Sequence, residues 1–268
     1  MTAVLARQFH TLHADGLLLL ANAWDAGSAR LAQAAGARAI ATSSAAVAWA
    51  HGWPDGDRLP VDLVLQTTRA IAGATGLPVT VDLEGGYSDE PARVGALVAD
   101  VMAAGAVGIN IEDGSKDPAL LVAKIAAARA AATTAGVDLF INARIDTWLR
   151  NLAPPAERVA ETLARAVRYR AAGASGLFAP GVTDAGEIAA LVAGTDMPVN
   201  VLAWTGLPDA DRLQALGVRR LSAGSAISEA MHGHVAAMMR EFLASGRLDT
   251  AAGKAATYGE LQGWMARG

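Results

Sequence analysis

The sequence predicts a single barrel of eight parallel β-strands that alternate with α-helices, followed by an extra C-terminal helical segment. Alanine-rich helical stretches end at a glycine and lead into short apolar runs, as at 34–37, 103–106 and 171–174. Such alternation requires a parallel sheet. Eight units of this kind between residues 17 and 222 fit a closed barrel better than an open doubly wound sheet, which is the alternative.

The eight strands are expected where an apolar run follows a helix end. A glycine ends a helix well because it adopts positive φ without a Cβ clash, and a short apolar run after it indicates a buried strand. The expected strands are residues 17–21, 39–42, 79–82, 107–112, 140–143, 176–179, 199–202 and 220–222. Helical segments are expected between most of them.

Two segments interrupt this alternation. The connection 43–60 is rich in Gly, Pro, Asp and Trp and is expected to be an active-site loop. Residues from about 225 onward, including a possible helix within 250–266, are expected to form helices that pack on the barrel or on a neighbouring subunit. No linker or charge run divides the chain, so residues 1–268 are interpreted as one domain.

The composition excludes several classes of protein. The net charge of -4 offers no positive surface for nucleic acid and no polybasic segment for a membrane. The absence of cysteine excludes disulfides, thiolate metal sites and a cysteine nucleophile. The apolar stretch Leu17–Ala23 is shorter than the roughly 20 residues that span a bilayer, and no secretion signal is visible. We therefore expect a soluble, cytoplasmic protein.

Acidic residues follow the third and fourth strands. Asp82, Glu84 and Glu112 should meet at one rim of the barrel, because consecutive parallel strands are usually neighbours. Oxygen ligands without cysteine or paired histidines favour Mg²⁺ or Mn²⁺ over Zn²⁺. The alternative is that these acids only form salt bridges with Arg144 and its neighbours.

Other strand ends carry candidate substrate-binding groups. Arg144 could clamp a carboxylate or phosphonate with two hydrogen bonds, unless it pairs only with Asp146 or Glu112. Ser43 and Ser44 could present N–H groups and hydroxyls to an anionic oxygen, although a Ser-Ser loop is more often only a turn. Further polar strand ends are Asn110, Asn142 and Asn200, and tryptophans near strand ends or in their loops are Trp24, Trp49, Trp53, Trp148 and Trp204. The tryptophans suggest an aromatic-walled pocket, or packing alone.

Five motifs occur in order along the chain, at 22–30 (NAWDAGSAR), 43–44 (SS), 81–87 (VDLEGGY), 108–114 (GINIEDG) and 142–146 (NARID). Together they resemble the isocitrate lyase and phosphoenolpyruvate mutase superfamily. The resemblance covers residues 17–225 and implies a β/α barrel, Mg²⁺ and a 2-oxo or 2-hydroxy carboxylate substrate. It also implies a homotetramer, or a dimer, in which the last barrel helix is exchanged between subunits.

The resemblance assigns roles to individual residues. It implies that Asp82 binds the metal directly while Asp55, Glu84 and Glu112 hold its waters. Ser43 and Ser44 would cradle a carboxylate or enolate oxygen, and Arg144 would bind and stabilise charge. The resulting catalytic set is Arg144, Glu112 and Ser43, and the substrate-binding set is Trp24, Ser43, Ser44, Asp55, Asn110, Arg144 and Asn200.

The sequence departs from the superfamily after the fourth strand. Isocitrate and methylisocitrate lyases carry a Lys-Lys/Arg-Cys-Gly-His motif there, whereas residues 112–118 pass almost directly into a helix. Ser115, Lys116 or Tyr87 could replace the missing cysteine acid, although Tyr87 fits packing better. We therefore expect Mg²⁺-dependent cleavage of a C–C or C–P bond through a metal-stabilised enolate, of the lyase or decarboxylase type. The alternatives are phosphoenolpyruvate mutase or phosphonopyruvate hydrolase-like chemistry, and a non-catalytic barrel that binds a 2-oxo acid.

Overall fold

The computed structural model describes residues 2–249 and 255–266 and contains eight parallel strands in one sheet. The strands are β1 (Leu18–Leu20), β2 (Ile40–Ala41), β3 (Val79–Asp82), β4 (Gly108–Glu112), β5 (Phe140–Arg144), β6 (Gly176–Ala179), β7 (Val199–Leu202) and β8 (Arg220–Ser222). Their order, β1-β8-β7-β6-β5-β4-β3-β2, brings the first and last strands together. The predicted barrel is confirmed and the open doubly wound sheet is wrong.

The barrel closes between β1 and β2 through very few contacts. One parallel bridge joins Ala23 to Thr42, and Ala23 N donates to Ala41 O at 2.7 Å. Asn22, with a φ of +40°, donates from Nδ2 to Thr42 O at 2.8 Å and accepts from Gly224 N at 3.0 Å. The side chain of Asn22 therefore links the segments after β1, β2 and β8 at the carboxyl end of the barrel.

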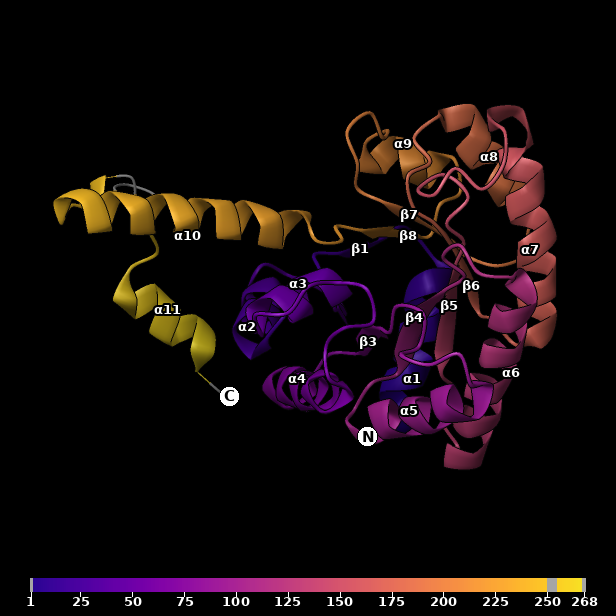
Figure 1. Ribbon diagram of the computed structural model, residues 1–268, viewed down its shortest axis with the longest axis horizontal. Coiled ribbons are helices and arrows are strands. Elements are labelled where there is room, and N and C mark those ends of the chain that lie inside the picture. Colours follow the sequence, from indigo (N-terminus) through magenta and orange to yellow (C-terminus); the bar gives the residue numbers. More distant parts are fainter. Residues whose placement is uncertain (1, 250–254, 267–268) are drawn as a thin grey trace.

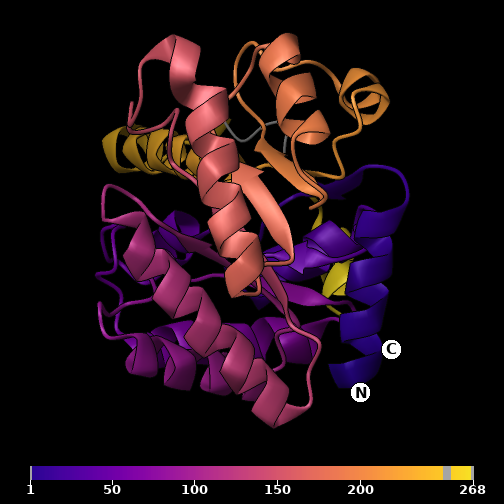
Figure 2. The same cartoon turned by 90° about the vertical axis from the view of Figure 1, so that its right-hand side faces the viewer.

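Helices surround the sheet, as the two views show (Figures 1 and 2). They are α2 (Ala26–Ala34), α3 (Ser44–Ala50), α4 (Val61–Ala74), α5 (Pro91–Ala103), α6 (Pro118–Ala135), α7 (Arg158–Ala172) after a 3-10 turn at Pro155–Glu157, α8 (Ala185–Ala193) and α9 (Ala210–Ala215). Side chains alternate along each strand, so Ile109 and Ile111 of β4 pack outward against helices while Asn110 points inward.

Helix α1 (Thr2–Ala14) covers the amino end of the barrel. Its Phe9 is fully buried and packs edge-on against Phe140 of β5, with ring centroids 5.5 Å apart. A Cβ on Gly108 would lie 2.7 Å from the Phe9 ring, so glycine is required at this position of β4 for the ring to enter. The amino end of the interior is thus apolar, which leaves the polar chemistry to the carboxyl end.

The chain leaves the barrel after β8. Helix α10 (Ala226–Ser245) projects away from the strands as a long arm, and α11 (Tyr258–Met265) turns back beside α2 (Figure 1). Arg30 on α2 donates from Nε to Trp264 O at 2.9 Å. The expected C-terminal helices are confirmed within the described residues, although part of the predicted helix 250–266 lies outside them. None of the described helices combines the length and apolar character needed to cross a membrane.

Candidate active site

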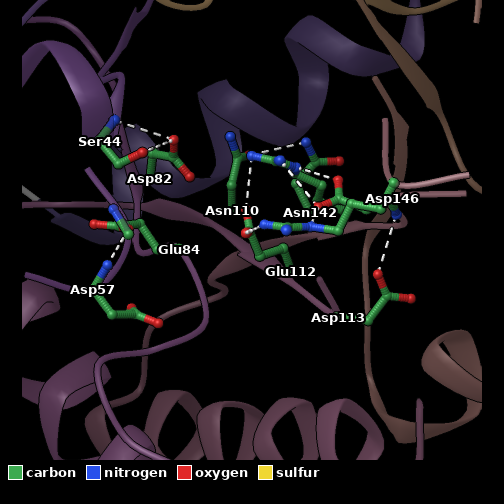
Figure 3. A network of polar contacts seen from close by, with 12 residues as sticks. Ser44, Asp57, Asp82, Glu84, Asn110, Glu112, Asp113, Asn142 and Asp146 are labelled. Carbon is green, nitrogen blue, oxygen red and sulfur yellow. Dashed lines mark hydrogen bonds and ion pairs between the residues drawn. The ribbon is translucent and has the colours of Figure 1, made fainter. Parts of the chain in front are cut away.

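Polar side chains from neighbouring strands meet at the carboxyl end of the barrel (Figure 3). The register places Asp82 of β3 beside Asn110 of β4, and Asn110 beside Asn142 of β5. Two residues further along the same strands, Glu112 of β4 is paired with Arg144 of β5. The strand ends of β3, β4 and β5 therefore bring together the acids, amides and guanidinium that the sequence predicted for one site.

Arg144 is held by two acids at once. Its Nε and Nη2 donate to the two oxygens of Asp146 at 2.6 and 3.1 Å, and Nη1 lies 2.7 Å from Glu112 Oε2. Both pairings that the sequence offered as the structural alternative are present. Burial raises the pKa of Glu112 to about 8, because desolvation outweighs the attraction of Arg144, and the charges of Asp146 and Asp82 raise it further.

Asp146 also holds a second guanidinium. Arg150 donates from Nε to Asp146 Oδ2 at 3.0 Å, and its Nη2 lies 3.8 Å from Glu112 Oε1. Asp146 is fully buried, and its own backbone N donates to Asp113 Oδ1 at 3.1 Å. Arg150 was not among the predicted site residues, although its position four residues after Asp146 was a signal that the two side chains could meet.

The two serines at the start of α3 have different partners, and only Ser44 contacts Asp82. Backbone N and Oγ of Ser44 both donate to Asp82 Oδ2, at 3.1 and 2.9 Å (Figure 3). Ser43 is the N-cap residue of α3, and its Oγ accepts from Ala46 N at 3.4 Å. Ser44 thus orients the Asp82 carboxylate, while Asp82 Oδ1 has no hydrogen bond from any described residue.

Glu84 fixes the loop that carries Asp55. Glu84 Oε2 accepts from the backbone N of Gly56 at 2.8 Å and from that of Asp57, and Tyr87 Oη donates to Glu84 Oε1 at 2.8 Å. Burial raises the pKa of both Glu84 and Asp55, and the charge of Asp82 raises that of Asp55 further. Asp57, which sequence analysis missed, accepts from Tyr87 N at 3.1 Å and links the two loops.

These carboxylates fit a hydrated divalent cation better than an ion that is coordinated only by protein side chains. Among the described residues, no three His, Cys, Asp or Glu side chains are arranged to hold a metal ion by themselves. Burial raises the pKa values of Asp55, Glu84 and Glu112, and neighbouring carboxylates raise them further, so a nearby cation would favour the charged form of all three. Mg²⁺ keeps several waters and needs only one or two direct carboxylates. The all-oxygen donor set fits the chemistry of such an ion.

Comparison with known proteins identifies the family. The profile of phosphoenolpyruvate phosphomutase matches residues 9–243. This chain belongs to the phosphoenolpyruvate phosphomutase family. An uncharacterized protein of Mycobacterium tuberculosis (strain H37Rv) is 43% identical over 223 residues, which cover 81% of each chain. An oxaloacetate decarboxylase of Bradyrhizobium sp. (strain BTAi1) is 31% identical over 181 residues, which cover 66% of this chain and 62% of that protein.

Solved structures agree with this family assignment. A candidate phosphonomutase from Burkholderia cenocepacia J2315 is 42% identical, with a TM-score of 0.84 over 88% of this chain and 99% of that chain. At 22% identity, 2,3-dimethylmalate lyase, a member of the phosphoenolpyruvate mutase and isocitrate lyase superfamily, shares the fold with a TM-score of 0.84 over 98% of this chain and 94% of its own. The resemblance found in the sequence is confirmed, and the chain is a member of a superfamily of lyases and mutases.

Within this family member, the connection from β4 to α6 is short. Only residues 113–117 lie between the two elements. Asp113 is buried and accepts from Arg165 Nη1 and Tyr169 Oη, both at 2.9 Å, so it supports the fold. Lys116 forms an ion pair with Asp89, whereas Ser115 is exposed. Of the three residues that could replace the missing cysteine acid, Tyr87 is the one that lines a small cavity together with Asp82.

Five other predicted residues have no hydrogen bond to the Asp82 carboxylate. Asn200 is buried in the barrel interior, where its Oδ1 accepts from Ser222 Oγ at 3.2 Å. Trp24 packs partly buried against the outer core, and Trp148 is buried with its Nε1 bonded to Glu187 at 3.1 Å. Trp53 and Trp204 are exposed. Sequence analysis missed Arg220 of β8, because the adjacent Arg219 and Arg220 gave no sign that the side chain of Arg220 points into the barrel.

Proposed function

We propose that this protein is an Mg²⁺-dependent enzyme that cleaves a C–C bond next to the enolisable carbon of a small 2-oxo carboxylate, as a lyase or decarboxylase. The observation that carries the proposal is the Arg144–Glu112 pair beside the Asp82 carboxylate at the ends of adjacent strands. A fixed guanidinium next to a cation site can bind a carboxylate and stabilise negative charge that develops on its neighbouring oxygen.

The residues of the chain would divide the work in the following way. Asp82 would bind Mg²⁺ through its free oxygen, with Ser44 holding the other oxygen, while Asp55, Glu84 and Glu112 accept hydrogen bonds from the ion's waters. The bound ion would supply Lewis-acid polarisation of the 2-oxo group. Arg144, aligned by Asp146, would bind the substrate carboxylate. In decarboxylation the bond from C3 to the carboxylate carbon breaks and that carboxylate leaves as CO2. The electron pair of the bond forms the enolate, and C3 then takes up a proton from solvent.

Two findings favour decarboxylation over reactions that need a closed site. The connection 113–117 is too short to hold a long gating loop between β4 and α6. Excluding water is less important for a reaction whose intermediate needs only protonation, so an open site suffices. The Bradyrhizobium relative is named an oxaloacetate decarboxylase, which makes a 2-oxo dicarboxylate the first substrate to test. The match to a candidate phosphonomutase makes phosphonopyruvate the second.

A pyruvate-release assay tests the proposal. Oxaloacetate, phosphonopyruvate and methylisocitrate are supplied with Mg²⁺ or with EDTA, and pyruvate is measured with lactate dehydrogenase against blanks that contain Mg²⁺ without enzyme. We expect Mg²⁺-dependent turnover of at least one substrate and a loss of about 100-fold or more in Asp82→Ala. Asp100→Ala, on the exposed face of α5, is the matched control and should behave as the wild type. Unchanged turnover and Mg²⁺ affinity in Asp82→Ala would contradict the metal assignment.

We also propose that the active form is an oligomer in which α10 packs on a neighbouring subunit. Only Ser228 is buried along the whole of α10, although the helix carries Met239, Phe242 and Leu243 on its surface. The outer faces of β1 and β8, where an eighth barrel helix normally packs, instead line a groove of about 420 Å³. A second copy of α10 has the apolar surface to fill that groove.

A further inference from the structure

Arg220 of β8 is a buried cation in the barrel interior without a carboxylate partner among the described residues. Its side chain is 1% exposed. Nε donates to Ser222 Oγ at 3.4 Å and Nη2 donates to Asn110 Oδ1 at 3.2 Å, while Nη1 has no hydrogen-bond partner. Burial lowers the pKa of Arg220 to about 9, and the charge of Asp82 opposes that shift. A guanidinium in this setting is costly for stability, and an apolar residue of similar size would be cheaper.

The contact with Asn110 fixes which way its amide faces. A guanidinium only donates hydrogen bonds, so the Asn110 atom that faces Arg220 must be the oxygen. The same oxygen accepts from Asn142 Nδ2 at 2.9 Å, and Asn142 Oδ1 occupies space above Gly176, where a Cβ would lie 2.8 Å away. The amide of Asn110 is therefore held from two sides, and its Nδ2 cannot exchange places with Oδ1.

The other side of Asn110 belongs to the active site. Asn110 is paired with Asp82 in the β3–β4 register, and Figure 3 shows it between Asp82 and Asn142. Among the described residues nothing accepts a hydrogen bond from Asn110 Nδ2. With Oδ1 held by Arg220 and Asn142, the N–H groups of Asn110 are left to donate to a substrate oxygen beside the Asp82 carboxylate.

We propose that Arg220 is a positioning residue: it locks the Asn110 amide so that Nδ2 donates to the substrate oxygen that gains negative charge. Ser222 accepts a hydrogen bond from Arg220, and Asn200 accepts one from Ser222, so these buried residues of β7 and β8 help to hold the Arg220 side chain in place. The fixed positive charge of Arg220 strengthens the N–H donor by polarising the amide whose oxygen it binds. This inference depends on the proposed function, because it requires a substrate oxygen at that place.

A double-mutant cycle tests the coupling. Arg220→Met, Asn110→Ala and the double variant are compared by kcat and KM for pyruvate release with Mg²⁺. We expect each single substitution to lower kcat by about 10- to 100-fold, and the double variant to match Asn110→Ala within about twofold. Arg220→Lys, which keeps one donor for Asn110 Oδ1, should recover part of the loss. Multiplying effects in the double variant, or wild-type kcat in Asn110→Ala, would overturn the proposal.

Three further experiments separate positioning from folding. Arg129→Met removes another partly buried arginine, which binds the carbonyls of Leu139 and Gly173 far from Asp82, so it should lower Tm and leave kcat unchanged. If Arg220→Met does not fold, Asn142→Leu removes the second donor to Asn110 Oδ1 and must itself lower kcat for the proposal to stand. Calorimetry with Mg²⁺ and oxalate, a stable mimic of the enolate of pyruvate, should show weaker oxalate binding in Asn110→Ala and Arg220→Met.

The controls distinguish the two possible failures. Wild-type protein that neither releases pyruvate nor binds Mg²⁺-oxalate would overturn the proposed function and this inference with it. Wild-type protein that does both, with oxalate affinity and kcat unchanged in Asn110→Ala, would overturn only the role of Arg220 and Asn110.

Discussion

At the scale of single residues, the site depends on buried acids that hold guanidinium groups in place. Asp146 receives three N–H donors from Arg144 and Arg150, although none of its surface reaches solvent. A buried carboxylate is tolerated when its lone pairs are satisfied in this way. Asp146 therefore acts on the substrate only through Arg144, whose remaining Nη1 is shared with Glu112.

Replacing Asp146 with asparagine should separate these roles. Asp146→Asn leaves Arg144 with one fewer charge partner, so we expect kcat/KM for pyruvate release to fall by about 10- to 100-fold. The free energy of unfolding should fall by about 3 kcal/mol, because a buried ion pair is broken. Urea unfolding and steady-state kinetics measure the two effects. Asp196→Asn is the control, because it breaks an exposed ion pair with Arg170 and should change neither quantity. An unchanged kcat/KM in Asp146→Asn would contradict a role for Asp146 in aligning Arg144.

The residues that sequence analysis found are those directly at strand ends. Asp82, Glu112 and Arg144 each end a strand, so an apolar run followed by a polar residue was enough to place them. Asp57, Arg150 and Arg220 were missed for different reasons. Asp57 and Arg150 reach the site from loops, whose paths no periodicity predicts, and Arg220 lies at the beginning of β8, with a side chain long enough to reach Asn110.

At the scale of elements, α1 closes the amino end of the barrel with aromatic side chains. His13 stacks on Phe140 with ring centroids 4.1 Å apart, and it meets Phe9 edge-on at 4.7 Å. His13 Nδ1 lies 2.8 Å from Phe9 O, which can only accept, so Nδ1 carries the proton of the neutral ring. Nε2 is buried without a partner among the described residues.

This environment makes the stability of the protein depend on pH through His13. Burial, with help from the charge of Arg220, lowers the pKa of His13 from 6.5 to about 3. Below pH 6.5 the unfolded chain takes up a proton that the folded protein refuses, so stability is complete above pH 6.5 and falls as pH drops toward 3. Between pH 7 and pH 5, His13 alone should lower the free energy of unfolding by about 2 kcal/mol.

Comparison with a variant isolates that contribution. We expect the free energy of unfolding, measured with urea, to fall by about 2 kcal/mol less in His13→Leu than in the wild type between pH 7 and pH 5. The buried acids with raised pKa values are common to both proteins, so their opposite effect cancels in the difference. His234→Leu, on α10 and far from α1, should keep the wild-type dependence. Equal losses in His13→Leu and wild type would show that His13 is protonated in the folded protein.

At the scale of the whole molecule, the sequence predicted the barrel better than the arm. Strand positions follow from apolar runs and glycine punctuation, which are local signals, and all eight strands lie where they were expected to within a residue or two. The direction of α10 depends instead on what it packs against. Its sequence carries a few large apolar residues without a continuous buried stripe, so it indicates a helix but not its partner.

The arm leads to a prediction about assembly. Leu19 is 54% exposed on the outer face of β1 and lines the groove together with Leu17 and Leu221, which leaves an apolar surface where a barrel normally carries a helix. If α10 of a second copy covers this groove, light scattering of the wild type should give a mass that is a multiple of the chain mass. Leu19→Glu should shift the measured mass toward that of the monomer, because the substitution would bury a charge in the contact. Val167→Glu makes the same change at an exposed position of α7 and should leave the mass unchanged, with circular dichroism confirming that both variants are folded. A wild-type protein with the mass of one chain would mean that α10 extends into solvent, and the groove would then have to be covered by something other than this helix.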